Sequence, residues 1–215
     1  MHRPPARRPR RVAAALTVVA AALAAACGGA DDVDDAVAVA VVAQPCSSPN
    51  RDHGVGVIIG PGLVATAAHV VDGERRLLTV DGRPASVLVV DSRTDLALLR
   101  AEVDGPGATT TDTALDHGVV RTPDGDRDVD VVRSGRLVVD DATDGVRYER
   151  HVHTFTPGVE PGTSGAPLLD DDGRLAGIVV LANRTDDTSY AVTAAELRTL
   201  IDAAATSPAP VGCPD

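Results

Sequence analysis

The sequence predicts an all-β fold closed by one C-terminal helix. Short runs of Val, Leu and Ile recur from His53 onward, with Gly, Pro and Asp residues between them. Only residues 193–205 carry a helical spacing of apolar side chains. Many short strands at this spacing are typical of a β-sandwich or a β-barrel. The chain is long enough for one such domain or for two fused small barrels.

The N-terminal residues have the pattern of a secretory signal. Residues 1–11 carry five arginines and no acid, and residues 12–26 are small and apolar. This pattern predicts a signal peptide over residues 1–26, and the apolar run is short for a membrane-spanning helix. Cys27 follows in "LAAACGG", which resembles a bacterial lipoprotein processing box with Ala24 where Leu is usual. We expect lipid on Cys27 at the outer face of a bacterial cell membrane; ordinary cleavage with free secretion is the alternative.

Residues 27–50 are rich in acid, Ala, Pro and Ser, and we expect a flexible linker there. Cys46 lies just before the predicted strands, and Cys213 lies in the tail 204–215. In an exported protein this pair predicts a disulfide that joins the two ends of the domain at 51–203. Two unpaired thiols are the alternative.

The predicted helix has both a start signal and an apolar face. Thr193 and Glu196 have the spacing of a capping box. Leu197, Leu200 and Ile201 fall on one face of the helix that follows.

The composition excludes several classes of function. The net charge is −11, and it is −16 without residues 1–26, because five arginines and no acid lie there. A strongly acidic chain is a poor ligand for nucleic acid and for anionic lipid. All basic residues are arginine, so Ser–Lys dyads and lysine Schiff bases are excluded. Three aromatic residues in the whole chain do not make a stacking platform.

A serine in "PGTSGAPLLDDDGRLAGI" is the first candidate for chemistry. Ser164 lies among glycines, which predicts either a turn or a close approach of the backbone to a substrate. A serine nucleophile needs a base, and that base needs an orienting acid. "ATAAHVVDG" offers His69 and "DSRTDLALLR" offers Asp95, each beside a strand-like run. The chain order His, Asp, Ser is that of the chymotrypsin-like arrangement.

These motifs resemble those of the trypsin and chymotrypsin family, in particular its bacterial HtrA-like members. "TAAHVV", "DLALL", "GTSGAPLLDDDGRLAGIV" and "SYAVTAAELRTLI" are each similar to a family motif, and the resemblance covers residues 51–203. It implies two six-stranded antiparallel β-barrels with a C-terminal α-helix, without a PDZ module. It also implies a serine endopeptidase that needs no cofactor.

The resemblance assigns a role to each of these residues. His69 would be the general base and then the general acid, and Asp95 would hold its tautomer. The backbone N–H groups of Gly162 and Ser164 would form the oxyanion hole. The primary pocket would be lined by seven residues: Gly158, Val159, Glu160, Pro161, Val180, Leu181 and Ala182.

The pocket residues are mostly small and apolar, so we expect a small or medium apolar side chain at the cleavage site. A Glu160 carboxylate turned inward would instead favour basic residues. Thr163 replaces the Asp or Asn of the family, so activation by an ion pair with a new N-terminus is not expected. Ala166 replaces a glycine, and its methyl group could crowd the pocket.

No metal site is expected. His151 and His153 share a strand face, but no third ligand accompanies them. The aspartate runs at 31–35 and 170–172 lack the spacing of a calcium loop, and we interpret them as a solvated linker and a turn. The run "DGDRDVD" at 124–130 is the one place where an accidental cation site stays an alternative. With the family resemblance, we expect a monomer that acts on polypeptides. Two alternatives are a catalytically silent homologue that binds peptides at the cell envelope and, less favoured, a triad hydrolase acting on esters.

Overall fold

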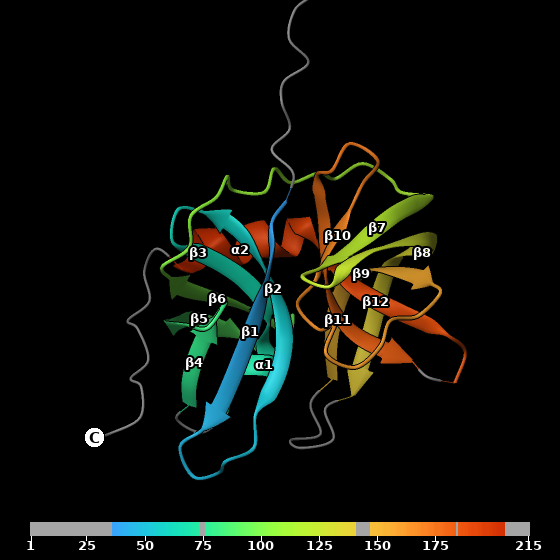
Figure 1. The fold of residues 1–215 in the computed structure, drawn as a ribbon. Coiled ribbons are helices and arrows are strands. Elements are labelled where there is room, and N and C mark those ends of the chain that lie inside the picture. The colour runs from blue at the N-terminus through green and yellow to red at the C-terminus, as the bar shows by residue number, and fades with distance from the viewer. Residues whose placement is uncertain (1–35, 74–75, 141–146, 184, 205–215) are drawn as a thin grey trace, which may run out of the picture. The chain divides into compact units, whose positions relative to one another are not determined.

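The computed structural model describes residues 36–73, 76–140, 147–183 and 185–204, and these residues form two closed β-barrels (Figure 1). The first barrel has the strand order β1-β2-β3-β6-β5-β4. Its strands are β1 (Ala38–Pro45), β2 (Asp52–Gly60), β3 (Leu63–Ala67), β4 (Arg76–Val80), β5 (Arg83–Asp91) and β6 (Leu96–Ala101). The short helix α1 (Ala68–Val71) follows β3.

The second barrel has the strand order β10-β11-β12-β9-β8-β7. Its strands are β7 (His117–Thr122), β8 (Gly125–Asp140), β9 (Arg147–Thr156), β10 (Pro167–Leu169), β11 (Leu175–Asn183) and β12 (Thr188–Thr193). All neighbouring strands in both barrels are antiparallel. The two six-stranded antiparallel barrels with a C-terminal helix confirm the expected architecture.

The linker prediction for residues 27–50 is wrong over Ala38–Pro45, which form β1. β1 pairs with β2 on one side and with β4 on the other, so it closes the first barrel. Val39, Val41 and Ala43 point into the core and are at most 2% exposed. Their alternation with outward residues is a strand pattern. It was missed because small Ala and Val side chains follow an acidic run, which together are typical of a linker.

The core is made of Val, Leu, Ile and Ala, with Phe155 as its one fully buried aromatic residue among those described. The helix α2 (Ala194–Ala204) leaves the last strand of the second barrel and packs against β6 and β11. Leu197 and Leu200 of α2 are buried, as the spacing predicts. Arg198 of α2 pairs with Asp112 of the connection between the barrels. That pairing lowers the pKa of the Asp112 carboxyl.

The predicted capping box is wrong, because the Thr193 hydroxyl is buried and has no hydrogen-bond partner among the described residues. Glu196 instead lies 3.7 Å from Nδ1 of His151 on β9. No described helix is long and apolar enough to cross a membrane.

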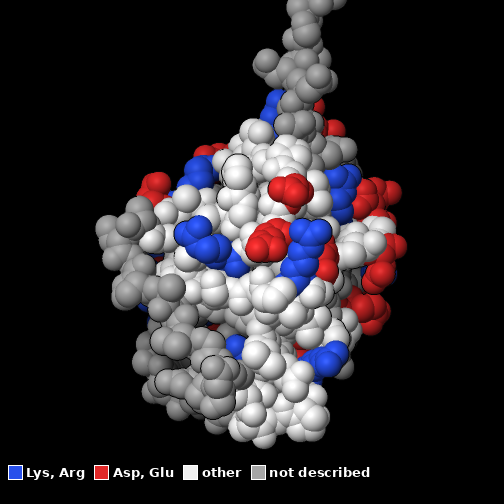
Figure 2. Space-filling view, turned by 60° about the vertical axis from the view of Figure 1, so that its left-hand side comes forward, with Lys and Arg blue, Asp and Glu red and all other residues white. Residues whose placement is uncertain are grey.

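Charged side chains of both signs are interspersed on the face drawn in Figure 2. Acidic side chains gather toward one edge of that view, and the basic ones form no continuous patch there.

Candidate active site

His69 is placed by the junction of β3 and α1. It is the second residue of α1, and its side chain is 48% exposed. The first turn of this short helix has no side-chain cap of its own. Asp95 supplies the missing acceptors, because its carbonyl accepts from the N–H of Ala68 at 2.9 Å and its Oδ1 accepts from the N–H of His69 at 2.9 Å. The backbone of α1 is therefore tied to Asp95.

Asp95 also binds the ring of His69. Its Oδ2 accepts from Nδ1 at 2.9 Å, and Oδ1 lies 3.1 Å from the same nitrogen. The carboxylate is 13% exposed. An acceptor at Nδ1 fixes the tautomer with its proton on Nδ1 and leaves Nε2 with a free lone pair. The pair therefore presents a base that faces away from Asp95.

The turn that carries Asp95, residues 91–95, is held by its own side chains. Asp91 accepts from the N–H of Arg93 at 3.0 Å and from the hydroxyl of Thr94 at 2.9 Å. Asp95 has a φ of 62°. This is a left-handed conformation that non-glycine residues seldom adopt and that persists only where surroundings enforce it.

Arg150 is a contact of this turn that the sequence did not reveal. It comes from β9 of the second barrel, and its Nη1 lies 3.5 Å from Oδ2 of Asp95. No motif contains Arg150, and 55 residues separate it from Asp95 in the chain. Only the packing of one barrel on the other brings the two together.

Ser164 lies in the loop between β9 and β10 and is docked on β2. Its carbonyl accepts from the N–H of Val55 at 2.8 Å. A Cβ on Gly54 would meet that carbonyl at 2.8 Å and the side chain of Val70 at 2.8 Å. Ser164 therefore approaches the helix that carries His69, over a glycine whose missing side chain leaves the room.

Gly165 shows how closely the serine loop approaches β2. Its φ is +91°, and a Cβ there would lie 1.8 Å from the carbonyl oxygen of Val55 and 2.4 Å from the hydroxyl of Thr66. Its N–H donates to the carbonyl of Val179 at 2.7 Å. Only glycine fits this position.

The backbone N–H groups of Gly162 and Ser164 are free to donate to a ligand. Among the described residues neither group donates a hydrogen bond, whereas Thr163 between them donates to the carbonyl of Glu160 at 3.2 Å. Gly162 has a φ of +94° and open space on its Cα. In the described part of the chain the Ser164 hydroxyl likewise makes no hydrogen bond, to His69 or to any other residue. Catalytic hydrogen bonds in unliganded enzymes are often long and tighten when substrate binds.

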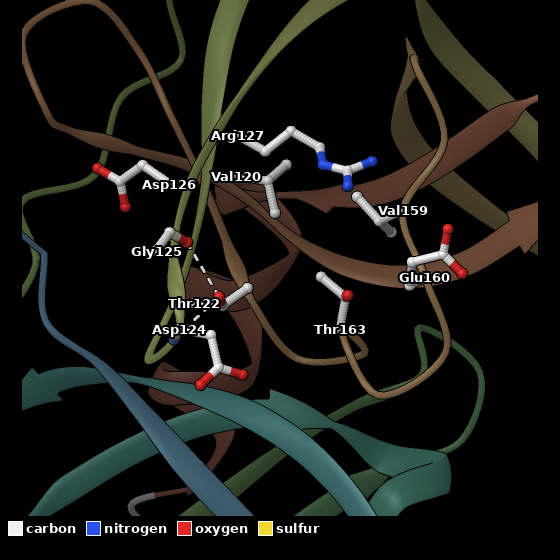
Figure 3. Close-up of a pocket in the computed structure, with 9 residues that line it drawn as sticks. All are labelled: Val120, Thr122, Asp124, Gly125, Asp126, Arg127, Val159, Glu160 and Thr163. Atoms are coloured by element: carbon white, nitrogen blue, oxygen red, sulfur yellow. Dashed lines mark hydrogen bonds between the residues drawn. The ribbon is translucent and has the colours of Figure 1, made fainter.

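A cavity of about 230 Å³ lies behind the serine loop (Figure 3). Thr163, Val159 and Glu160 face the β7–β8 hairpin across it. The Thr163 position carries a hydroxyl, so it provides no carboxylate partner for an ammonium group. Arg127 of the hairpin donates from Nη1 to the carbonyl of Gly158 at 3.0 Å and so supports the start of the serine loop.

A second cavity, of about 290 Å³, brings together five of the seven predicted pocket residues. They are Gly158, Val159, Glu160, Pro161 and Ala182. Asn183, Asp187 and Thr188 complete its wall. The other two predicted residues are not among its lining residues. Val180 is buried, and Leu181 is 43% exposed on a neighbouring surface with Leu137 and Val138.

Asp187 is the charged residue among the three lining residues that the sequence did not predict. Its Oδ1 accepts from the N–H of Gly158 at 3.1 Å, and a Cβ on Gly158 would lie 3.2 Å from that oxygen. The carboxylate is therefore against the wall formed by the serine loop. Asp187 lies 29 residues after Gly158 in the chain, directly before β12. An aspartate is common in such a turn, so nothing in the sequence indicated that this one lines a pocket.

His151 and His153 occupy different environments despite their spacing. His151 is exposed near Glu196, whereas His153 is 8% exposed and its Nδ1 lies 2.7 Å from the hydroxyl of Ser134. Burial lowers the pKa of His153 below its ordinary value of 6.5, and a hydrogen bond to the backbone of Ala176 acts in the opposite direction. In the described part of the chain no three His, Cys, Asp or Glu residues are grouped as for a metal. Cys27 and Cys213 lie outside the described residues, as do the signal 1–26 and residues 205–215 of the tail.

Comparison with known proteins places the chain in a family. Residues 54–178 match the family model described as a trypsin-like peptidase domain. Serine protease Rv3671c of Mycobacterium tuberculosis is 31% identical over 159 residues, and a probable periplasmic DegP-like serine endoprotease of Halomonas elongata is 31% identical over 147 residues. These matches cover 67% and 63% of this chain but only 40% and 31% of those proteins.

Solved structures agree with this assignment. The crystal structure of the Rv3671c protease in its active form has a TM-score of 0.70 and 26% identity, and the match covers 84% of this chain and 85% of that one. An inactive form of the same protease gives a TM-score of 0.60 with 25% identity over 76% of this chain and 87% of that one. The HtrA-type protease AlgW, solved with a tripeptide, shares the fold at a TM-score of 0.64 over 80% of this chain and 60% of that one, with 19% identity. The chain belongs to the trypsin-like peptidase family.

Proposed function

We propose that this protein is a serine endopeptidase whose nucleophile is Ser164, whose general base is His69 and whose orienting acid is Asp95. The observation that carries the proposal is the bond of 2.9 Å from His69 Nδ1 to Asp95, next to a serine loop docked on β2. The names of the relatives, serine protease and serine endoprotease, support the same chemistry.

In the proposed mechanism the Ser164 hydroxyl attacks the peptide carbonyl while Nε2 of His69 takes its proton. Asp95 stabilises the imidazolium that forms. The N–H groups of Gly162 and Ser164 donate to the oxyanion of the tetrahedral intermediate. His69 then protonates the leaving amine, and the acyl group stays on Ser164. Water, deprotonated by His69, hydrolyses this ester and restores the enzyme.

The pocket supports a basic residue at the cleavage site more than the apolar residue expected from the sequence. Glu160 and Asp187 both line the cavity of about 290 Å³, and none of its lining residues is cationic. Two carboxylates in a partly enclosed space attract a cation more strongly than they do in open water. Arg127 lines the neighbouring cavity of about 230 Å³ together with Glu160, and its Nη1 donates to the carbonyl of Gly158.

Two matched peptides that differ only at the cleavage position, Arg or Val, test this preference. We expect a higher kcat/KM for the Arg peptide and a smaller ratio for Asp187→Asn. Thr188→Val changes a neutral wall residue and serves as the control. Equal or higher kcat/KM for the Val peptide would restore the apolar assignment.

The same proposal places the protein outside the cytoplasm, held there by lipid on Cys27, as a monomer acting on polypeptides. The name of the Halomonas relative, periplasmic, supports export. Intact mass of the exported protein separates a lipidated Cys27 from an unmodified N-terminus.

Cleavage of unfolded casein by the full chain, beside Ser164→Ala, tests the central assignment. Endopeptidase activity that disappears in the variant supports it. A folded wild-type protein that leaves casein and small activated esters intact would instead favour a peptide-binding module.

A further inference from the structure

Arg150 is a buried arginine of the second barrel that reaches the turn carrying Asp95. It lies on β9 and is 9% exposed. Its Nε donates to the carbonyl of Arg93 at 2.7 Å, and its Nη2 donates to the carbonyl of Ser92 at 3.1 Å. Its Nη1 lies 3.5 Å from Oδ2 of Asp95. One side chain thus binds three residues of this turn from the opposite barrel.

These contacts account for the burial of a charged group. A guanidinium carries five N–H donors in a planar fork and remains protonated in proteins. Burying it without acceptors would be strongly unfavourable, as it is for any unpaired buried ion. Two carbonyls and one carboxylate supply the acceptors here. A single ammonium group cannot reproduce this arrangement, because it lacks the fork.

The Asp95 carboxylate lies between Arg150 and His69. Its Oδ2 accepts from Nδ1 of His69 at 2.9 Å and faces Nη1 of Arg150 at 3.5 Å. The carbonyls of Ser92 and Arg93 belong to the peptide units that lead into Asp95, whose φ is 62°. Arg150 therefore contacts both the carboxylate and the backbone that directs it.

We propose that Arg150 is a positioning residue for peptide hydrolysis, which fixes the turn at residues 91–95 and through it the orientation of the His69 ring. The inference rests on the proposed function. Arg150 stands on the barrel that carries Ser164, and its three acceptors stand on the barrel that carries His69. It therefore holds the base in register with the nucleophile across the junction of the barrels.

Two substitutions of Arg150 in the full chain separate the effect of the hydrogen bonds made by its guanidinium from the effect of its charge. Arg150→Met keeps an apolar stem and removes every donor; we expect kcat to fall by about 10- to 100-fold, since small misplacements of catalytic groups have effects of this order. We expect KM to change by less than about twofold, because Arg150 does not face the pocket. Arg150→Lys keeps the charge on a single ammonium group, without the planar fork, and should recover part of the loss of kcat.

Arg136→Met is the matched control. Arg136 lies on β8 of the same barrel and pairs with the exposed Glu149 at 3.0 Å, away from Asp95. We expect unchanged kcat for this variant. Active-site titration with a fluorophosphonate, run to its end point, gives the concentration of enzyme with a reactive Ser164, so that a loss of stability is not mistaken for a loss of kcat.

A spectroscopic readout keeps this inference separate from the proposed function. In Ser164→Ala, the proton between His69 and Asp95 should give a downfield NMR resonance. We expect it to persist with Arg136→Met and to be lost or shifted with Arg150→Met. If the wild-type protein cleaves nothing, the proposed function fails, and this resonance still tests Arg150.

An Arg150→Met protein that melts at a lower temperature but keeps both kcat and the resonance would overturn the proposal. Arg150 would then be a structural residue only. If Arg150→Met does not fold, the same comparison is made with Arg150→Lys. A kcat and a resonance equal to those of the wild-type protein in this variant would also overturn the proposal.

Discussion

At the scale of single residues, the serine loop depends on a glycine that no other residue can replace. Gly165 has a positive φ, and the carbonyl of Val55 and the hydroxyl of Thr66 occupy the space of a side chain. The backbone can therefore lie against β2 and place Ser164 beside the helix of His69. The requirement is one of space as well as of conformation.

Gly165→Ala should lower the free energy of unfolding by about 3 kcal/mol or more, from a left-handed alanine together with a backbone clash. Gly82→Ala is the control, because Gly82 has a φ of +75° and a Cβ added there would have nothing within 4 Å. The free energy of unfolding of Gly82→Ala should fall by about 1 kcal/mol, which is the cost of the left-handed conformation alone. Urea denaturation measures both values, and equal losses would show that the space around Gly165 can relax.

His153 gives the stability a dependence on pH. Burial lowers the pKa of His153 in the folded protein below the value of 6.5 that holds when it is exposed. The unfolded chain therefore binds more protons than the native one below that pH. The contribution of neutral His153 to the free energy of unfolding is therefore complete well above pH 6.5. It is lost as the pH falls from 6.5 through the lowered pKa of the folded protein.

We expect the free energy of unfolding to decrease between pH 7 and pH 5, and His153→Gln to remove part of this slope. Urea denaturation at several pH values measures it. A variant whose slope equals that of the wild-type protein would show that His153 does not contribute.

Sequence motifs pointed to the candidate catalytic residues but not to the residues that contact and hold them. "TAAHVV", "DLALL" and "GTSGAP" were enough to select His69, Asp95 and Ser164, since each motif is local. Arg150 and Asp187 contact residues that are 55 and 29 positions away in the chain. Contacts of this kind depend on the packing of the barrels, and no pattern along one strand encodes them.

At the scale of elements, β1 is the strand that local patterns concealed. Its inward side chains are two valines and an alanine that alternate with other small residues, so their periodicity gives little contrast in hydropathy. The partners β2 and β4 decide its structure, because an open edge of the barrel would leave their backbone groups unpaired. The capping box at Thr193 failed for the opposite reason: the pattern was present, but Glu196 turned toward His151.

Val41→Ala tests whether β1 is an integral strand. Val41 is 0% exposed. We expect the substitution to lower the free energy of unfolding by about 2 kcal/mol, because it removes two buried methyl groups and leaves a cavity. Val42→Ala, on the outward side of the same strand, should lose less than about 1 kcal/mol. A mobile linker would show no loss at either position.

At the scale of the whole molecule, the two ends of the domain are expected to be joined. Cys46 directly follows β1, and the pairing with Cys213 stays a prediction because Cys213 lies outside the described residues. In the chain-entropy model, closing so long a loop stabilises the fold by up to roughly 5 kcal/mol. Such a bond would join the end of β1, the strand that closes the first barrel, to the C-terminal tail.

Cys213→Ser should therefore lower the unfolding midpoint of the oxidised protein. Dithiothreitol should lower the midpoint of the wild-type protein and leave that of the variant unchanged. Identical midpoints for both proteins under oxidising conditions would rule the bond out.

Hydrogen bonds join the turn at residues 91–95 to the β3–α1 junction, and the serine loop docks on β2 of the same barrel. We infer that these segments form a working nucleophile at Ser164. Among the described residues another serine contacts a histidine: the hydroxyl of Ser134 lies 2.7 Å from Nδ1 of His153.

The most direct measurement is the intact mass of the oxidised full chain after treatment with a fluorophosphonate probe, for the wild-type protein, Ser164→Ala and Ser134→Ala. We expect one label on the wild-type protein and on Ser134→Ala, and none on Ser164→Ala. A folded wild-type protein that takes up no label, or a label that survives in Ser164→Ala, would contradict the assignment of Ser164 as the nucleophile.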